Sequence, residues 1–367
     1  MKREELMALA RRMLTLPTAP YHEQDVQASA IDFCRGLAGV RVEQDRAGNL
    51  IARYRRGAAG TPLVFVAHMD HPGFEMLGGK RAEFLGGVPR EMFTKGGQIR
   101  VYSGLRPPDS QRPYTRARIR HFQGSAWPKR KLVELQSETP LRKGDFGMWD
   151  VPAFRVARGR LHAAAIDDVL GTVVMLATLA EVSRRRLRAH IWCAFTRAEE
   201  VGFQGAQALI RSGKISKNAL VVSIEMSKER PWARIGQGPI VRVGDRATIF
   251  DPSATAFLLG MAAKCRVRET TFRAQRCLMD GGSCEATAFA GFGYRVGGVC
   301  LPQGNYHNIG QGRRPRAEYV SVNDLEQLVK LTVAAATEWR GEFPANAVLR
   351  RWLVALSREA PRKLPGK

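Results

Sequence analysis

The sequence lacks any long uninterrupted run of apolar residues. No segment approaches the roughly 18 uncharged apolar residues that a membrane-spanning helix requires, and the start, Met1–Glu5, leads into an amphipathic pattern rather than an apolar signal segment. The six cysteines are scattered, without close pairs or the Cys/His spacing of a zinc finger. We therefore expect reduced, mostly buried thiols in a cytoplasmic protein with no membrane partner.

Acidic residues are few relative to basic ones. The chain has 34 Asp and Glu against 58 Lys and Arg, which gives a formal net charge of +24. Such a charge attracts nucleic acid, acidic lipid or acidic substrates over long range. The basic excess is spread over residues 112–160 and 350–367 without a recognisable nucleic-acid-binding module. The pattern favours an arginine-rich solvated surface, and we do not expect nucleic acid as a partner.

Alternating helix and strand patterns lie on both sides of a segment whose pattern predicts only short strands. A chain of 367 residues corresponds to about two domains. Helical spacing covers 4–14, 23–37, 170–183, 204–212, 254–265, 283–290 and 322–339, and strands are expected at 40–42, 50–54, 63–67, 190–195, 220–224 and 296–301. Between 73 and 160 the pattern changes to short β segments, such as 98–102 and 131–135, separated by Gly and Pro.

These patterns predict an α/β fold with a mixed, mostly parallel sheet flanked by helices. The α/β domain would comprise residues 1–72 and 161–345. A small inserted β domain would occupy residues 73–160, and a basic C-terminal tail would follow at 346–367.

Residues able to bind a metal follow four of the predicted apolar strands. They are His68 and Asp70 after 63–67, Glu199 and Glu200 after 190–195, Glu225 after 221–224, and His307 in the loop after 299–301. Asp167 and Asp168 directly precede a predicted helix. Because the same ends of parallel strands lie on one edge of a sheet, we expect these side chains to converge.

Convergence of so many carboxylates requires positive charge. Clustered carboxylates repel and raise one another's pKa values unless cations neutralise them. Mixed histidine and carboxylate ligands suit zinc, cobalt or manganese better than calcium or magnesium. Taken alone, His68 could be an ordinary hydrogen-bonded histidine after a strand. Asp167 and Asp168, taken alone, could be an ordinary N-cap pair before a helix. Their joint occurrence with the other acids favours a metal site.

Several segments, in order along the chain, resemble one known family. Residues 67–70 (Ala-His-Met-Asp), 165–171 (Ala-Ile-Asp-Asp-Val-Leu-Gly), 195–202 (Phe-Thr-Arg-Ala-Glu-Glu-Val-Gly) and 205–206 (Gly-Ala) resemble motifs of the tetrahedral aminopeptidases. That family includes glutamyl and deblocking aminopeptidases, within the clan of co-catalytic di-zinc exopeptidases. Residues 45–50, 143–146 and 281–286 add support, and the resemblance extends to about residue 339.

The resemblance implies a site for two divalent metal ions, expected to be zinc, with cobalt or manganese as alternatives. One ion would be bound by His68 and completed by Glu225. The second would be bound by Glu200 and His307, and Asp167 would bridge the two.

The resemblance also implies two catalytic roles beside the metals. Glu199 would be the general base, and Asp70 would hold the His68 imidazole, as second carboxylates commonly do for metal-bound histidines. A water or hydroxide held by both metals would attack the scissile carbonyl, while Glu199 removes a proton and later delivers it to the leaving amine. The expected activity is that of an aminopeptidase that hydrolyses the N-terminal residue of small peptides. The family also implies a homo-oligomer assembled through the inserted β domain.

Some positions differ from the family pattern and keep alternatives open. Residues 71–73 are His-Pro-Gly where the family usually has Glu-Ile-Gly, and Val169 stands where Arg is usual. Glu225 stands where the aminopeptidases usually have Asp, and Glu occurs there in carboxypeptidase-like and deacylase-like relatives. A di-metal carboxypeptidase or N-deacylase is therefore an alternative. A non-catalytic binding protein on the same scaffold is another.

Overall fold

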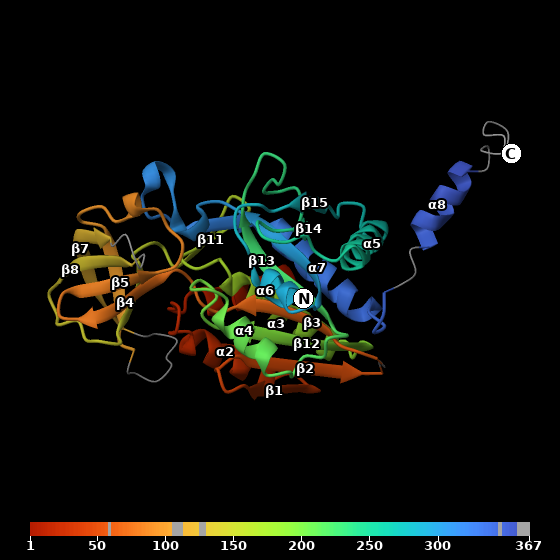
Figure 1. Cartoon of the computed structure of the whole chain (residues 1–367), viewed down its shortest axis with the longest axis horizontal. Coiled ribbons are helices and arrows are strands. Elements are labelled where there is room, and N and C mark those ends of the chain that lie inside the picture. The colour runs from red at the N-terminus through yellow and green to blue at the C-terminus, as the bar shows by residue number, and fades with distance from the viewer. Residues whose placement is uncertain (58–59, 105–112, 125–129, 344–346, 358–367) are drawn as a thin grey trace.

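An eight-stranded mixed sheet organises the larger part of the molecule (Figure 1). The computed structural model describes residues 1–57, 60–104, 113–124, 130–343 and 347–357. The strand order across the sheet is β1-β2-β12-β3-β13-β16-β14-β15. In that order the strands are β1 (Val40–Gln44), β2 (Leu50–Arg56), β12 (Ala189–Thr196), β3 (Leu63–His68), β13 (Leu220–Lys228), β16 (Arg295–Gln303), β14 (Ile240–Gly244) and β15 (Gln275–Leu278). The predicted mixed, mostly parallel sheet is confirmed.

Strand β3 lies inside the sheet, between β12 and β13, and is parallel to both. Every residue of β3 is buried, as its continuous apolar sequence predicted. Its side chains alternate between two layers of helices. Leu63, Phe65 and Ala67 belong to one apolar cluster, whereas Val64 and Val66 belong to another.

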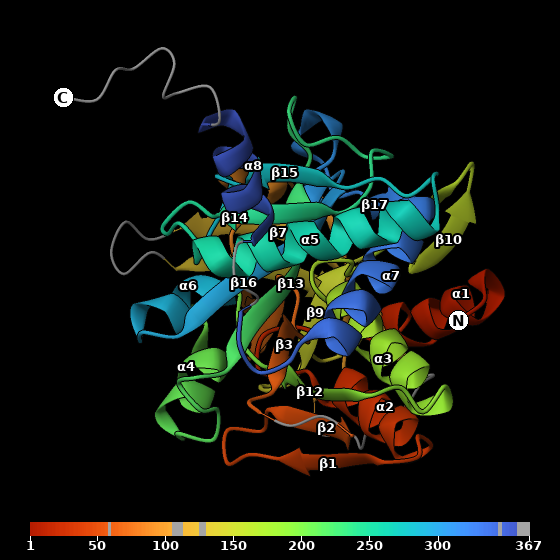
Figure 2. The ribbon, with the colours of Figure 1, turned by 90° about the vertical axis from the view of Figure 1, so that its right-hand side faces the viewer.

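Helices cover both faces of the sheet (Figure 2). One face packs against α1 (Arg3–Leu14), α2 (Gln24–Arg35), α3 (Val169–Arg184), α5 (Pro252–Arg268) and α7 (Val322–Glu338). The other face packs against α4 (Gln204–Arg211) and α6 (Glu285–Gly291). The sheet is therefore the middle layer of an α/β/α sandwich.

Helix α3 is almost wholly buried, because its sequence is apolar on all sides. It contacts α1, α7 and β3. It begins directly after Asp167 and Asp168, and the side chain of Asp168, although at the N-cap position, caps no backbone N–H. The buried start of α3 fixes Asp167 beside the end of β3.

A closed six-stranded barrel is inserted between β3 and α3 (Figure 1). In barrel order the strands are β4 (Gly73–Gly78), β5 (Arg81–Leu85), β8 (Lys131–Ser137), β7 (Tyr114–Gly124), β6 (Gln98–Tyr102) and β9 (Phe146–Trp149). Phe74, Phe84 and Trp149 fill its interior with edge-on and tilted ring contacts. The inserted β structure is thus confirmed, whereas the exact division of domains at 73 and 160 stays a prediction.

A small three-stranded sheet joins the region after the barrel to the end of the α/β body. It consists of β10 (Phe154–Ala157), β11 (Arg160–Ala163) and β17 (Glu318–Ser321). In this sheet Ala163 pairs with Glu318. The short β segments predicted between 73 and 160 include β10, but the sequence patterns named none of these three strands individually, nor β14 and β15. Four of the five have only four residues, too few for hydrophobic alternation to identify, whereas β14 has five, as many as the predicted β1.

The predicted basic tail contains a helix, α8 (Ala347–Ser357), while residues 346 and 358–367 lie outside the described part. Exposed side chains of α8 include Trp352 and Leu356. No helix in the described ranges is both long and apolar enough to cross a membrane.

Candidate active site

The sequence-predicted metal ligands converge although they lie up to 239 residues apart along the chain, from His68 to His307. His68 is the last residue of β3, and Asp167 directly precedes the Asp168 cap of α3. Glu200 lies in the loop after β12, and His307 in a short turn, Tyr306–Asn308, after β16. Glu225 lies within β13 rather than after it, because the strand continues to Lys228.

Asp167 lies between two histidines, with one oxygen facing each. Its Oδ1 is 3.6 Å from His68 Nε2, and its Oδ2 is 3.4 Å from His307 Nε2. His307 Nε2 also lies 3.1 Å from Glu200 Oε1. All four side chains are at least nine-tenths buried.

These side chains form two groups of possible metal ligands that share Asp167. The first group is His68, Asp167 and Glu225, and the second is Asp167, Glu200 and His307. Within each group the candidate ligand atoms all lie within 4.8 Å of one another. Asp167 Oδ1 and Glu225 Oε1 are buried and have no hydrogen-bond partner in the described part of the chain. Unpartnered buried oxygens facing imidazole nitrogens fit a pair of divalent cations.

Glu199 also lies close to this centre. A third group of candidate ligands contains His68, Glu199 and Glu200, and Glu199 Oε2 is 3.8 Å from His68 Nε2. Proximity alone therefore allows Glu199 to be either a ligand or an acid-base group.

The electrostatics of the site reflect many acids in a confined space. Burial, together with the charges of Asp167 and Glu285, raises the pKa of Glu225 to about 8, against the opposing charge of His68. Burial likewise raises the pKa of Glu199 well above its ordinary value, with Glu200 adding to the shift. Acids in such a site ionise fully only when further positive charge is present. Bound cations would supply that charge.

Asp70 contacts both sides of the site. His68 Nδ1 lies 3.1 Å from the backbone carbonyl oxygen of Asp70 and 3.4 Å from its Oδ1, so both the backbone and the carboxylate of Asp70 face the imidazole. The two carboxylate oxygens of Asp70 also accept hydrogen bonds from the backbone N–H groups of Glu199 (3.0 Å) and Glu200 (3.1 Å). Sequence reasoning predicted the first contact and missed the second, because backbone contacts across strands leave no local pattern.

His71 joins the site through the backbone of Asp167, a contact that the sequence did not indicate. Its Nδ1 lies 2.5 Å from the Asp167 carbonyl oxygen, and its Nε2 lies 3.0 Å from Asn308 Oδ1. Asn308 in turn donates to the Ala164 carbonyl oxygen at 2.9 Å. The departure from the family pattern at position 71 is therefore accommodated by a buried hydrogen-bonded chain.

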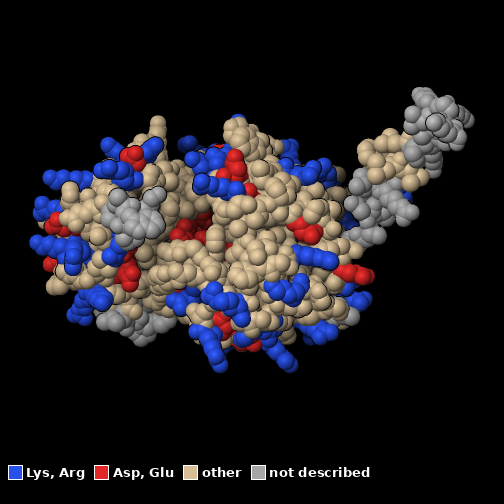
Figure 3. Space-filling view, in the orientation of Figure 1, with Lys and Arg blue, Asp and Glu red and all other residues tan. Residues whose placement is uncertain are grey.

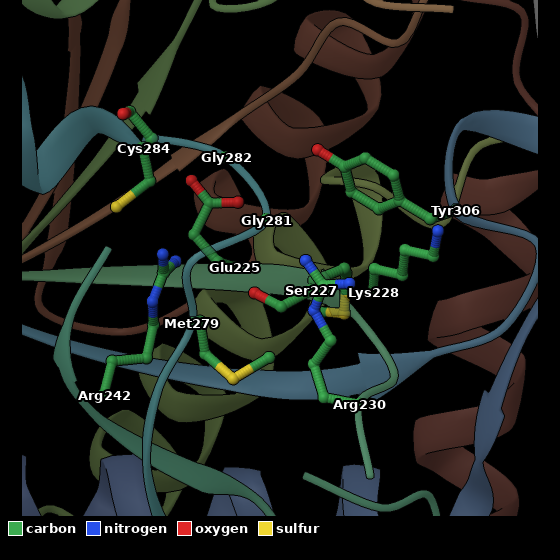
Figure 4. A pocket seen from close by; sticks show the side chains of 12 residues that line it. Glu225, Ser227, Lys228, Arg230, Arg242, Met279, Gly281, Gly282, Cys284 and Tyr306 are labelled. Atoms are coloured by element: carbon green, nitrogen blue, oxygen red, sulfur yellow. The ribbon is translucent and has the colours of Figure 1, made fainter. Parts of the chain in front are cut away.

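A cavity of about 190 Å³ adjoins the acidic cluster, with Glu225 on its wall (Figure 4). Three basic side chains also line it: Lys228, Arg230 and Arg242. Arg242 comes from β14, which the sequence patterns did not predict, and only 3% of its surface is exposed. Its Nε has no hydrogen-bond partner among the described residues. In Figure 4 its guanidinium extends toward Glu225 and Cys284.

The charge distribution on the surface sets this site apart from its surroundings. Figure 3 shows acidic side chains in a hollow between the barrel and the α/β body, while Lys and Arg cover much of the visible surface around it. The hollow is therefore a local exception to a strongly basic surface.

Comparison with known proteins identifies the family. The sequence model of the M42 glutamyl aminopeptidase family matches residues 48–331. The fold is shared with several solved structures of low sequence identity. They include an aminopeptidase from the archaeon Desulfurococcus kamchatkensis (TM-score 0.75, 20% identity, covering 93% of this chain and 97% of that one).

Two further solved structures show the same fold. The TET1 peptidase of Pyrococcus horikoshii has a TM-score of 0.73 and 21% identity, over 91% of this chain and 100% of that one. A TET aminopeptidase from a marine-sediment archaeon of the Thaumarchaeota has a TM-score of 0.74 and 16% identity, over 91% of this chain and 97% of that one. The family match covers well over half of the sequence and all the motifs that suggested the resemblance except the start of the 45–50 segment. The chain therefore belongs to the M42 glutamyl aminopeptidase family, a family of metallo-aminopeptidases.

Proposed function

We propose that this chain uses two divalent metal ions, held at the two ligand groups that share Asp167, to remove the N-terminal residue of peptides. His68 and Glu225 would complete one ion's ligands, and Glu200 and His307 the other's. The observation that carries the proposal is the position of Asp167, whose two oxygens face different histidines. Imidazole and carboxylate donors favour zinc, with cobalt or manganese as alternatives.

When bound, such ions polarise the scissile carbonyl and make water a better nucleophile. Glu199 would act as the general base, taking a proton from water and passing it to the leaving amine. Burial raises the pKa of Glu199 above its ordinary value, which makes the carboxylate a stronger proton acceptor. Asp70 would keep the His68 imidazole oriented and the Glu199–Glu200 backbone in position.

We further propose that acidic N-terminal residues are preferred substrates. A buried guanidinium without a full set of partners is costly, and a substrate carboxylate would complete the partners of Arg242. Lys228 and Arg230 add positive charge to the same cavity.

A direct assay tests these proposals. The metal-free protein is reconstituted with Zn²⁺, Co²⁺ or Mn²⁺ and given aminoacyl p-nitroanilides of Glu, Asp, Leu and Lys. We expect activity only with metal, and at least tenfold higher kcat/KM for Glu or Asp than for Leu or Lys. Equal rates on all four substrates would contradict the acidic preference.

The same assay separates the alternative activities. N-acetyl-glutamate serves as a deacylase substrate, followed by the free amine that is released, and an N-acetylated peptide with an unblocked C-terminus serves as a carboxypeptidase substrate. Cleavage of these substrates, without cleavage of the free-amine ones, would identify an N-deacylase or carboxypeptidase. No cleavage by protein that carries two ions would identify a binding protein.

We also propose that the chain self-associates through the barrel segment at 73–160. One relative with this fold is described as a dodecamer, and the TET1 peptidase of Pyrococcus horikoshii as a tetrahedron or a large octahedral shell. Light scattering on the full chain tests the proposal. A mass of 40.7 kDa, that of one chain, at micromolar concentration would contradict it.

We propose that the protein is located in the cytoplasm. All six cysteines are free and buried, which suits a reducing compartment. Fractionation of the producing cells would test it, and recovery outside the cytoplasm would contradict it.

A further inference from the structure

We propose that Glu318 is a positioning residue that ties the bridging ligand Asp167 to the second-ion ligand His307. This inference rests on the proposed function. Glu318 is the first residue of β17, and its side chain is wholly buried. No sequence motif singled it out, and it is not a member of any of the three candidate ligand groups.

The two carboxylate oxygens of Glu318 serve two different segments. Oε2 accepts hydrogen bonds from the backbone N–H groups of Ile166 (2.7 Å) and Asp167 (3.1 Å). Oε1 accepts from the backbone N–H of His307 (2.8 Å) and from Gln303 Nε2 (3.3 Å). One side chain therefore holds the backbone of two residues that face each other across the second ligand group.

The turn that carries His307 needs such support. His307 has a φ of 54°, and its neighbours Asn305 and Asn308 have φ values of 55° and 61°. Left-handed backbone is uncommon for residues other than glycine, although Asn and His adopt it more often than most, and three such residues within four positions benefit from contacts that fix them. Glu318 supplies the contact to the His307 N–H, while the Gly87 carbonyl oxygen lies 2.8 Å from the other ring nitrogen, Nδ1.

Glu318 is itself anchored by the small sheet. It pairs with Ala163 across β11 and β17, and Ala163 precedes Asp167 by four residues. The backbone around Asp167 and the carboxylate that receives its N–H thus belong to one rigid unit. We therefore expect a change at Glu318 to move ligands rather than to unfold the chain.

The geometry makes the expected effect unequal for the two ions. Glu318 contacts two members of the second group, Asp167 and His307, but only Asp167 of the first. In Glu318→Gln, one of the two oxygens becomes an NH₂ group that faces N–H donors instead of accepting from them. The second ion should consequently lose more affinity than the first.

The test is a metal titration of the full chain, monitored by calorimetry. Elemental analysis of the dialysed protein then gives the number of bound ions per chain. We expect two Zn²⁺ per wild-type chain, and in Glu318→Gln a second site weakened at least tenfold with the first nearly unchanged. Excess Zn²⁺ should restore kcat in protein that circular dichroism shows to be folded before metal is added, because zinc would also rescue an unfolded fraction by mass action. Glu318→Asp, which keeps the charge but shortens the reach, serves as a second variant if Glu318→Gln does not fold.

Asp324→Asn is the matched control. Asp324 is also a buried carboxylate that accepts backbone hydrogen bonds, from Gly236 (2.6 Å) and Gly238 (2.9 Å), but it contacts no residue of the ligand groups. The Asp324→Asn variant should lose stability and keep both ions. Two tight ions in the Glu318 variants, or equal metal loss in Asp324→Asn, would overturn the positioning role. A wild-type chain that binds fewer than two ions would overturn the proposed function itself.

Discussion

The proposed roles of the adjacent residues Glu199 and Glu200 differ, although both carboxylates lie close to a histidine. Glu200 Oε1 lies 3.1 Å from His307 Nε2, whereas Glu199 Oε2 lies 3.8 Å from His68 Nε2. Asp70 fixes the backbone of both, so the two side chains cannot readily exchange places. These distances do not separate the two roles, since the proposed ligand Asp167 also lies 3.6 Å from His68 Nε2, and Glu199 as the base stays a proposal.

Glu199→Gln tests this assignment. The amide keeps the shape of the side chain but cannot take up a proton. We expect metal content and KM to stay near wild-type values while kcat falls by about 10²–10⁴-fold. Loss of one metal equivalent would instead identify Glu199 as a ligand, and near-normal kcat with both ions bound would rule out its role as base.

Arg242→Gln tests the acidic preference. Removing the guanidinium deletes the positive charge deepest in the cavity while leaving Lys228 and Arg230 in place. We expect kcat/KM for Glu p-nitroanilide to fall by about 10- to 100-fold, the equivalent of roughly 1.4–2.7 kcal/mol for a lost charge-assisted contact. The rate on Leu p-nitroanilide should change much less. An equal fall on both substrates would show that Arg242 supports the site without reading the side chain.

Glu285 offers a test through pH. Burial, with a smaller contribution from Asp70, raises its pKa to about 7 from an ordinary value near 4.5. The folded chain therefore keeps a proton that the unfolded chain has lost between these values, so this group lowers stability as pH rises from about 4.5 to 7. Glu285→Gln should flatten that dependence, as measured by urea unfolding at pH 5, 6, 7 and 8. An unchanged slope would show that Glu285 titrates normally.

At the scale of elements, sequence patterns predicted the long apolar strands and helices and the groups at their ends. His68 after β3 and Asp167 before α3 could be identified because buried parallel strands place their ends on one edge. Arg242 and Glu318 could not, because neither lies at the end of a predicted apolar strand or within one of the motifs. Their contacts depend on pairing with distant strands, which hydrophobic periodicity does not encode.

The start of α3 gives a prediction at this scale. A Cβ at Gly171 would lie 2.4 Å from both carboxylate oxygens of Asp168, which is buried beside Asp167. Gly171→Ala should therefore displace Asp168 and cost about 1–3 kcal/mol of unfolding free energy. Chemical denaturation would measure the change.

Gly260 provides the control for this substitution. It lies inside α5, where an added Cβ would meet nothing within 4 Å. Gly260→Ala should be neutral or stabilise the chain by up to about 1 kcal/mol, because alanine favours helix. If both alanine variants behaved alike, close packing around Asp168 would not explain the effect at Gly171.

At the scale of the whole molecule, the excess of basic charge surrounds a site that is locally acidic (Figure 3). Composition predicted the basic surface, but only the fold shows where the acids collect. A positive exterior attracts acidic peptides over long range, and the effect should weaken with salt. We expect kcat/KM for a peptide of net negative charge, such as Glu-Asp-Asp, to fall as NaCl rises from 20 to 500 mM, and kcat/KM for Leu p-nitroanilide, whose net charge is positive, to stay constant or rise. Equal salt dependence for both would argue against steering by charge.

Metal removal should also be visible in global stability. Ligands that bind only the folded state stabilise it by mass action, by about 4 kcal/mol per site at a thousand times Kd. Stripping the ions with a chelator should lower Tm by several degrees, and restoring Zn²⁺ should reverse the change. A Tm that does not respond to chelator would contradict tight binding at the buried acids.

The most direct test of the two-metal site is anomalous X-ray diffraction at the zinc edge from crystals of the full chain. We predict two peaks about 3.5–4 Å apart, the usual separation of paired catalytic metals. One should lie among His68, Asp167 and Glu225, and the other among Asp167, Glu200 and His307. A single peak, or two peaks that do not share Asp167, would contradict the account.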